Sequence, residues 1–384
     1  MSEAKTPKLF IQSFARKAVR IILTIFIILL GCVLIFVGVI AAVSPGKPKP
    51  FLDQSGKEIP GSISEKTFVT INGVKQGMFI KGKDKTKPVL LFVHGGPGMP
   101  EYFLTDSYPT GLENVFTVCW WDQRGAGLSY SSDIKAETMT TEQLVSDTTE
   151  VSKYLCKRFG QDKIYLMGHS WGSFIAIQAA AKSPELYRAY IGMGQMTNQT
   201  ESEKLAHEYL LKYYADVNDK GMVEKLKNSP VGTKGYSSLR NDVRYDVLHR
   251  TGIGTTRDMK SVFTGVFIPS LMNQEYTFTE KINLWRGKIF SKKDTNLDKE
   301  KDETDISTKI PKLDIPTYFF SGAYDYTVNY SMSEAYLKEL DAPLKGFYLF
   351  KNSAHSPAFE EPEKSLCILR EDVLAGKNSL ADVQ

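Results

Sequence analysis

Cysteine is scarce in this sequence. The four cysteines are Cys32, Cys119, Cys156 and Cys367; none forms a Cys-x-x-Cys pair, and an odd number, three, follows residue 46. Such spacing favours neither a disulfide framework nor a zinc site. We therefore expect free, buried thiols, and we expect no metal at the functional site.

A basic excess is missing from most of the chain. The formal net charge is +4, and residues 1–20 alone carry five cations against Glu3. The rest of the chain therefore has no net charge. Proteins that bind nucleic acid usually carry a basic face, so we expect no nucleic-acid partner.

Charge is absent from residues 21–46, and residues 21–43 are almost wholly apolar. About 20 apolar residues suffice to cross a bilayer as a helix, and the cations that precede them favour a cytoplasmic N-terminus. We expect a basic cytoplasmic tail (1–20), a transmembrane anchor (21–43), a linker (44–65) and an extracytoplasmic domain at the cell membrane. A cleaved signal peptide and a buried core helix are the alternatives; Pro45 would follow the small residues of a cleavage site.

Short apolar runs alternate with helical patterns through much of the remaining chain. Runs typical of strands lie at residues 67–72, 77–80, 88–93, 115–121, 163–167, 189–193, 316–320 and 346–350. Helical patterns follow several of them, and this alternation predicts a mostly parallel α/β sheet with helices on both faces. We assign residues 66–198 and 312–384 to this core domain.

Residues 199–311 interrupt the alternation. They show helical patterns but no clear buried strand, so we interpret them as a helical cap inserted into the sheet domain. Residues 291–305 form a mixed-charge run, for which we expect a solvated loop.

Ser170 lies between two glycines, Gly168 and Gly172, where a strand is expected to turn into a helix. This is the setting of a nucleophile elbow, in which a strained turn exposes the serine hydroxyl. A tight structural turn is the alternative interpretation.

A nucleophilic serine needs a base and an orienting carboxylate, which follow it as acid and then histidine in this fold. His355 follows the last expected strand and Asp325 the strand before it, so both would lie at the carboxyl edge of the sheet. Asp341 and Asp314 are less well placed. For the oxyanion donors we expect the backbone N–H groups of Trp171 and Gly96.

Three segments resemble motifs of the proline iminopeptidase-like branch of the α/β-hydrolases. They are His-Gly-Gly-Pro-Gly (94–98), Trp-Asp-Gln-Arg-Gly-Ala-Gly-Leu-Ser (121–129) and Gly-His-Ser-Trp-Gly-Ser (168–173). Ser-Gly-Ala-Tyr-Asp (321–325) and Ala-His-Ser (354–356) match the acid and base positions of that branch. The resemblance spans residues 67–374 and implies an α/β-hydrolase fold with a helical cap, a serine mechanism and no cofactor. The Asp122–Arg124 loop would brace the site.

The resemblance further implies an aminopeptidase that acts on short peptides. Family members bind the free amine of the substrate with acidic residues that include cap glutamates; the candidates here are Glu201, Glu203, Glu208, Glu224, Glu275 and Glu280. Aromatic cap residues, among them Trp285, are candidates for lining the pocket. Two alternatives remain open: an esterase or amidase that acts on small neutral acyl substrates, and a non-catalytic cell-surface binding module.

Overall fold

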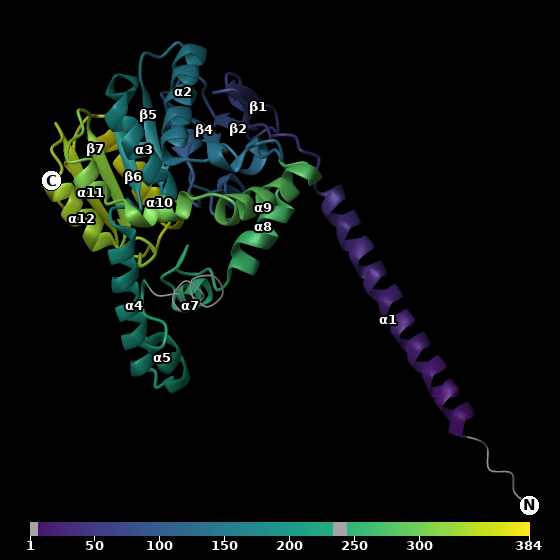
Figure 1. The fold of residues 1–384 in the computed structure, drawn as a ribbon. Coiled ribbons are helices and arrows are strands. Elements are labelled where there is room, and N and C mark those ends of the chain that lie inside the picture. The colour runs from purple at the N-terminus through teal and green to yellow at the C-terminus, as the bar shows by residue number, and fades with distance from the viewer. Residues whose placement is uncertain (1–6, 233–243) are drawn as a thin grey trace, which may run out of the picture.

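The computed structural model describes residues 7–232 and 244–384, and it is organised around one eight-stranded sheet (Figure 1). The strand order is β1-β2-β4-β3-β5-β6-β7-β8; β1 and β2 are antiparallel to their neighbours, and the other strands pair in parallel. The strands are β1 (Ile63–Ile71), β2 (Val74–Gly82), β3 (Val89–Val93), β4 (Thr117–Trp121), β5 (Ile164–His169), β6 (Tyr187–Met193), β7 (Thr317–Gly322) and β8 (Lys345–Phe350). All eight expected strand regions are confirmed.

Both faces of the central strands β3, β4, β5 and β7 are buried, which explains their nearly continuous apolar runs. In β3, Leu91 and Val93 pack into one core layer, whereas Leu90 and Phe92 pack into the other. Successive strand residues point to opposite faces, so a strand covered on both sides is apolar at most of its positions. The first layer includes residues of α2 (Thr141–Phe159), α3 (Trp171–Lys182) and α12 (Tyr330–Glu339); the second includes residues of α14 (Pro362–Ile368) and the short helix Tyr102–Asp106.

The region after β6 is helical, as expected. Its described helices are α4 (Gln199–Asp216), α5 (Lys220–Lys227), α7 (Arg244–Arg250), α8 (Ile268–Met272), α9 (Phe278–Lys293), α10 (Leu297–Glu303) and α11 (Ile306–Lys309). The expectation of a solvated loop at 291–305 was wrong, because α10 occupies its centre. Leu297 at the start of α10 is 1% exposed, and this single apolar residue fixes the otherwise charged helix to the core.

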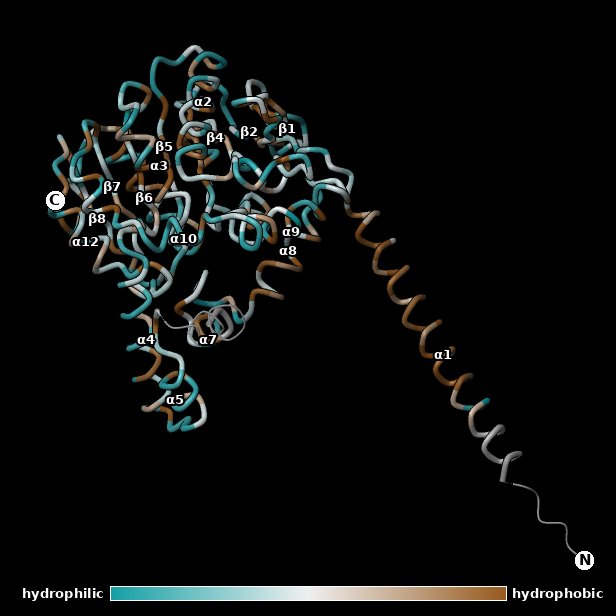
Figure 2. Tube along the Cα trace, viewed as in Figure 1, coloured by the Kyte–Doolittle hydropathy of each residue, from teal (hydrophilic) through white to brown (hydrophobic). Residues whose placement is uncertain are grey.

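The N-terminal helix α1 (Pro7–Ala42) projects away from the domain (Figure 1). Within it, residues Ala15–Ala42 form a helix long and apolar enough to cross a membrane, although a signal sequence passes the same test. Only 6% of its most apolar window is buried, so the helix is not part of the domain core. Figure 2 shows its hydrophobic character along most of its length.

The first residues of the segment after α1 contact the cap. The Gly46 N–H donates to the Gln274 carbonyl at 3.1 Å, and Pro45 forms an isolated antiparallel β-bridge with Thr277.

The four cysteines are all free, and Cys119 is buried as expected. Cys156 is half-buried, whereas Cys32 on α1 and Cys367 on α14 are exposed. The expectation of buried thiols was therefore wrong for Cys32 and Cys367. Cys32 is exposed because α1 stands apart from the domain, and Cys367 because it lies on the outer side of α14.

Candidate active site

Ser170 lies at the turn between β5 and α3. Its φ of 55° and ψ of −123° lie outside the regions that residues with a side chain usually adopt. Such strain persists only where the surrounding structure imposes it, and it is frequent at functional positions. Here the β5–α3 packing imposes it and leaves Ser170 at the carboxyl edge of the sheet.

The two flanking glycines are required by close packing of the elbow. A Cβ at Gly172 would lie 1.9 Å from the Val93 carbonyl oxygen, and a Cβ at Gly168 would lie 2.5 Å from the Gly172 carbonyl oxygen. Neither distance is possible for a real side chain. Both glycines therefore let α3 approach β3 and β5 closely.

Asp325 and His355 form a buried hydrogen-bonded pair. The Asp325 Oδ2 is 2.8 Å from the His355 Nδ1, and the Asp325 side chain is fully buried. The other carboxylate oxygen, Oδ1, accepts from the backbone N–H groups of Thr327 and Val328. These bonds fix the carboxylate as an acceptor, so His355 Nδ1 carries a proton in this pair and the Nε2 atom lies on the opposite side of the ring.

The His94–Gly98 loop carries the candidate oxyanion donor. The Gly95 N–H donates to Glu101 Oε1 at 3.0 Å, so the next amide, that of Gly96, is the candidate. The Trp171 N–H lies in the first turn of α3, where a helix has unpaired donors and its dipole favours negative charge.

His94 holds this loop rather than reacting. Its Nε2 accepts from the Gln123 N–H at 3.1 Å, and its Nδ1 lies 2.7 Å from the Gly95 carbonyl. Burial lowers the pKa of His94 to about 4, so the ring is neutral at physiological pH. Gln123 also accepts from the Trp171 indole at 3.1 Å, which ties the loop to the elbow.

The Asp122–Arg124 loop is itself held by buried polar contacts. The Asp122 Oδ2 accepts from the Leu128 N–H at 2.8 Å, and Arg124 makes two bonds of 2.7 and 3.0 Å to Asp147. All three charged side chains are buried. These contacts fit the bracing role expected from the sequence.

An ion pair that the sequence did not suggest lies beside the elbow. The His169 Nδ1 is 2.9 Å from both carboxylate oxygens of Glu101, and its Nε2 is 2.8 Å from the His355 carbonyl oxygen. Both ring nitrogens face acceptors, so both carry protons and the imidazole is charged. Burial opposes ionisation of each partner, but their attraction outweighs it; the pKa of Glu101 is lowered and that of His169 is raised.

One cavity of about 410 Å³ brings these groups together. It is lined by Ser170, His355, Gly96, Glu101 and His169 from the sheet domain. The cap contributes a mainly apolar and cationic wall: Leu248, His249, Gly254, Thr255, Val262, Val266, Trp285, Lys288, Ile289, Lys292 and Lys293. A site of this size suits a small ligand, and its only described carboxylate is that of Glu101.

The cap glutamates lie elsewhere in the described structure, and of the substrate-binding candidates only Trp285 lines the cavity. Glu275 is buried against Lys81 and Tyr102, at 3.2 and 2.8 Å. Glu201 and Glu208 are exposed, and Glu201 pairs with Lys204. Glu203 is buried and accepts a hydrogen bond from Gln199. Glu280 pairs with Lys66. Sequence spacing could not indicate the partners of Glu275 and Glu280, because these partners come from the distant first part of the chain.

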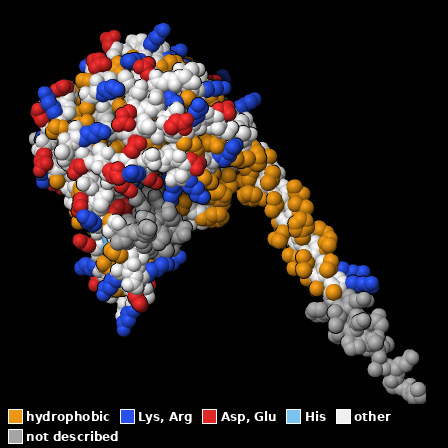
Figure 3. Space-filling view, viewed as in Figure 1, with side chains coloured by type: hydrophobic (Ala, Val, Ile, Leu, Met, Phe, Trp, Pro, Cys, Tyr) orange, Lys and Arg blue, Asp and Glu red, His pale blue; other side chains and the backbone are white. Residues whose placement is uncertain are grey.

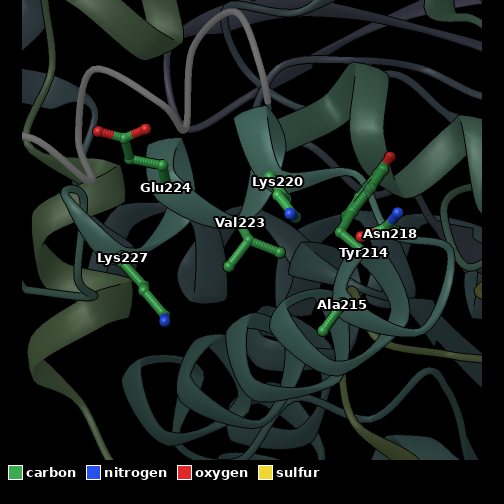
Figure 4. Close-up of a pocket in the computed structure, with 7 residues that line it drawn as sticks. All are labelled: Tyr214, Ala215, Asn218, Lys220, Val223, Glu224 and Lys227. Atoms are coloured by element: carbon green, nitrogen blue, oxygen red, sulfur yellow. The ribbon is translucent and has the colours of Figure 1, made fainter.

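Glu224 lines a different hollow, between α4 and α5 (Figure 4). This second cavity of about 390 Å³ is lined by Tyr214, Ala215, Asn218, Lys220, Val223, Glu224 and Lys227. These seven residues include no serine, cysteine or histidine, so the hollow offers no counterpart to the Ser170 cluster.

Comparison with known proteins agrees with this architecture. The family model described as alpha/beta hydrolase fold matches residues 88–362. The chain is 34% identical to the probable aminopeptidase YbaC of Bacillus subtilis over 78% of this chain and 93% of that protein. It is 25% identical to the proline iminopeptidase of Thermoplasma volcanium over 79% and 94%.

A solved structure shows the same fold. The proline iminopeptidase-related protein of Thermus thermophilus superposes with a TM-score of 0.57, at 18% identity, over 82% of this chain and 98% of that protein. Together with the Ser170 elbow and the eight-stranded sheet, the family match shows that the chain belongs to the α/β-hydrolase family, and the relatives named above show that it is similar to aminopeptidases and proline iminopeptidases of that family.

Proposed function

We propose that this protein is a membrane-anchored serine aminopeptidase that removes the N-terminal residue from short peptides. His355 Nε2 takes the Ser170 hydroxyl proton as Oγ bonds to the scissile carbonyl carbon, and Asp325 holds the resulting imidazolium. The backbone N–H groups of Gly96 and Trp171 stabilise the oxyanion. The C–N bond then breaks as His355 gives its proton to the leaving amine, and water hydrolyses the acyl-enzyme by the same route.

The observation that carries the peptidase assignment is the ionised Glu101 carboxylate beside Ser170. A Cβ built on Gly95 would lie 2.6 Å from Glu101 Oε1 and 3.3 Å from the Ser170 Cβ, so the carboxylate and the nucleophile are neighbours. A substrate ammonium that enters this partly enclosed cavity needs such a partner, because an unpaired buried charge costs several kcal/mol. We assign to Glu101 the role that the sequence suggested for a cap glutamate.

The alternative is an esterase or amidase for neutral acyl substrates. The apolar cap wall formed by Val262, Val266 and Ile289 favours it, since an acyl chain packs there without any charge partner. In that case Glu101 would serve only to hold His169 and the Gly95 amide.

Matched substrates separate the two activities. We would measure kcat/KM on prolyl and alanyl naphthylamides, each with a free and an acetylated amine, and on a short-chain p-nitrophenyl ester. Glu101→Gln keeps an acceptor for Gly95 but removes the charge. A hydrogen bond to a charged group contributes about 1.5–3 kcal/mol, so we expect a loss of about 10- to 100-fold confined to the free-amine substrates.

Exposed Glu201 supplies the matched control, since Glu201→Gln lies outside the cavity and should leave all rates unchanged. Equal rates on free and acetylated amines, or turnover of the ester alone, would defeat the peptidase assignment. An equal fall on every substrate in Glu101→Gln would mean that Glu101 only supports the site.

We also propose that α1 anchors the enzyme with its N-terminus in the cytoplasm. The exposed apolar surface of residues 15–42 would otherwise meet water, and the cations of residues 1–20 favour the cytoplasmic side. The catalytic domain is then extracytoplasmic.

A further inference from the structure

The cap carries an exposed apolar surface next to the end of α1. We call it the apolar cap face and define it by Phe263, Met272, Ile282 and Ile289, whose exposed fractions are 61%, 46%, 43% and 51%. Figure 3 shows hydrophobic side chains gathered on the domain where α1 leaves it. Soluble proteins rarely expose large contiguous apolar patches without a partner.

Aromatic contacts join the two segments that form this face. Phe263 stacks on Phe267 with ring centroids 5.3 Å apart, and Phe267 meets Trp285 of α9 at 5.0 Å. On α9, Ile282, Trp285 and Ile289 recur every three or four residues, and therefore share one side of the helix. The face is thus one surface built by α8, α9 and the short π-helix Phe263–Phe267.

The end of the anchor is fixed to this same part of the cap. Lys281, which precedes Ile282 in the sequence, donates from its Nζ to the Val43 carbonyl at 3.0 Å. Ile40 is 4% exposed although its neighbours in α1 are exposed, so the helix end packs on the domain. A helix rises about 1.5 Å per residue, and about 20 residues cross the roughly 30 Å hydrocarbon layer. If the anchor ends near Val43, then Lys281 and the cap residues around it lie at the membrane surface.

Cationic side chains accompany the apolar ones along α9. Arg286, Lys292 and Lys293 are exposed, and Lys288, Lys292 and Lys293 also line the Ser170 cavity. Apolar and tryptophan side chains beside lysines and arginines are typical of surfaces that lie in the headgroup region of anionic membranes.

We propose that the apolar cap face docks on the surface of the bilayer that α1 spans, among anionic phospholipid headgroups. Trp285 and Ile289 belong both to this side of α9 and to the cavity wall. Docking would therefore open the Ser170 cavity at the membrane interface and favour peptides or acyl compounds that partition there. This inference rests on the proposed anchor, but not on the proposed peptidase activity.

Spin-label accessibility in the full chain tests the docking. The protein would be placed in nanodiscs of phosphatidylethanolamine and phosphatidylglycerol, one copy per disc. Cys32→Ala, Cys156→Ser and Cys367→Ser remove the reactive thiols, and buried Cys119 stays. Single labels are then introduced by Phe263→Cys, by Ile282→Cys, or by Leu380→Cys as a matched control that is 45% exposed and near the C-terminus. A fourth protein keeps native Cys32 as the label site on α1.

Labels at positions 263 and 282 are expected to collide more with oxygen, which concentrates in lipid, than with a water-soluble nickel chelate. The label at 380 should show the reverse. Replacing phosphatidylglycerol by phosphatidylcholine should lower the oxygen preference at 263 and 282 but not at Cys32; no change would overturn the role of the cations.

Two results would overturn the docking itself: nickel-accessible labels at 263 and 282 while Cys32 remains in lipid, or labels shielded from both reagents, which would mean a protein contact. If Cys32 is itself nickel-accessible, the anchor fails and the docking fails with it.

Discussion

Gly172→Ala tests the geometry of the nucleophile elbow directly. The added methyl would lie 1.9 Å from the Val93 carbonyl oxygen and 2.6 Å from the His94 carbonyl oxygen. Real Cβ atoms are essentially never found within 3.0 Å of such atoms, so the end of β3 or the elbow must move by about 1 Å. Both obstacles are backbone atoms, which no change of side-chain rotamer can relieve.

Two effects, one on stability and one on catalytic rate, follow from this displacement. Overpacking of a close-packed core costs about 1–3 kcal/mol of unfolding free energy. A misplacement of about 1 Å in an active site can cost about 100-fold in rate, which is about 2.7 kcal/mol of transition-state stabilisation. Since Val93 leads into the loop that carries Gly96, we expect kcat/KM to fall by about 100-fold or more while the protein still folds.

The assay combines thermal unfolding, circular dichroism and the rate at which a fluorophosphonate labels Ser170. Gly221→Ala is the matched control, because a Cβ there would meet only Asp219 Oδ1 at 3.6 Å, within helix α5. That change should be neutral or stabilise by about 0.5–1 kcal/mol, since alanine favours helix over glycine. Wild-type labelling and stability in Gly172→Ala would refute the close approach of α3 and β3.

Further outcomes follow from the same contacts. A fluorophosphonate should label Ser170 in the wild-type protein, and it should label Ser170 far more slowly in the His355→Ala variant. No adduct on folded wild-type protein would favour a binding module. Normal labelling of the His355→Ala variant would mean that another group is the base. Asp325→Asn should lower kcat by orders of magnitude with little change in fold, about 10⁴ in a known triad; a loss below tenfold would argue against the role of Asp325. The pKa of His169 is raised in the folded protein, so the stability that its pair with Glu101 contributes is present below the unfolded pKa of histidine and is lost as the pH rises through the folded pKa of His169. The pKa of Glu101 is lowered, so the same stability is also lost when the pH falls through the folded pKa of Glu101. Thermal unfolding measured against pH should show the alkaline loss in wild type but not in His169→Gln. Protease added to intact protoplasts should digest the catalytic domain. Protection of that domain until lysis would mean that it lies in the cytoplasm. Removal of residues 1–45 should give a soluble, active enzyme.

Local sequence determined much of this protein. Each buried strand is a short apolar run because both faces of the sheet are covered, and the Gly168–Gly172 turn follows from the small residues that a close strand–helix packing demands. The order of Ser170, Asp325 and His355 placed all three after strands of one parallel sheet, whose carboxyl ends share an edge. These features depend on periodicity and steric rules that act over a few residues.

Only the tertiary structure decided which charges meet. Glu101 and His169 are 68 residues apart in the sequence, and no pattern in the residues around either one predicts that they form an ion pair. The sequence could not show which cap glutamates bind substrate and which are structural, because a partner such as Lys81 of Glu275 lies 194 residues away in the sequence. Helix α10 forms where charge alone suggested a loop, because one leucine reaches the core. The contact of Val43 with Lys281, 238 residues away, likewise exists only once the chain is folded, because pairing over such separations depends on the whole packing rather than on local preference.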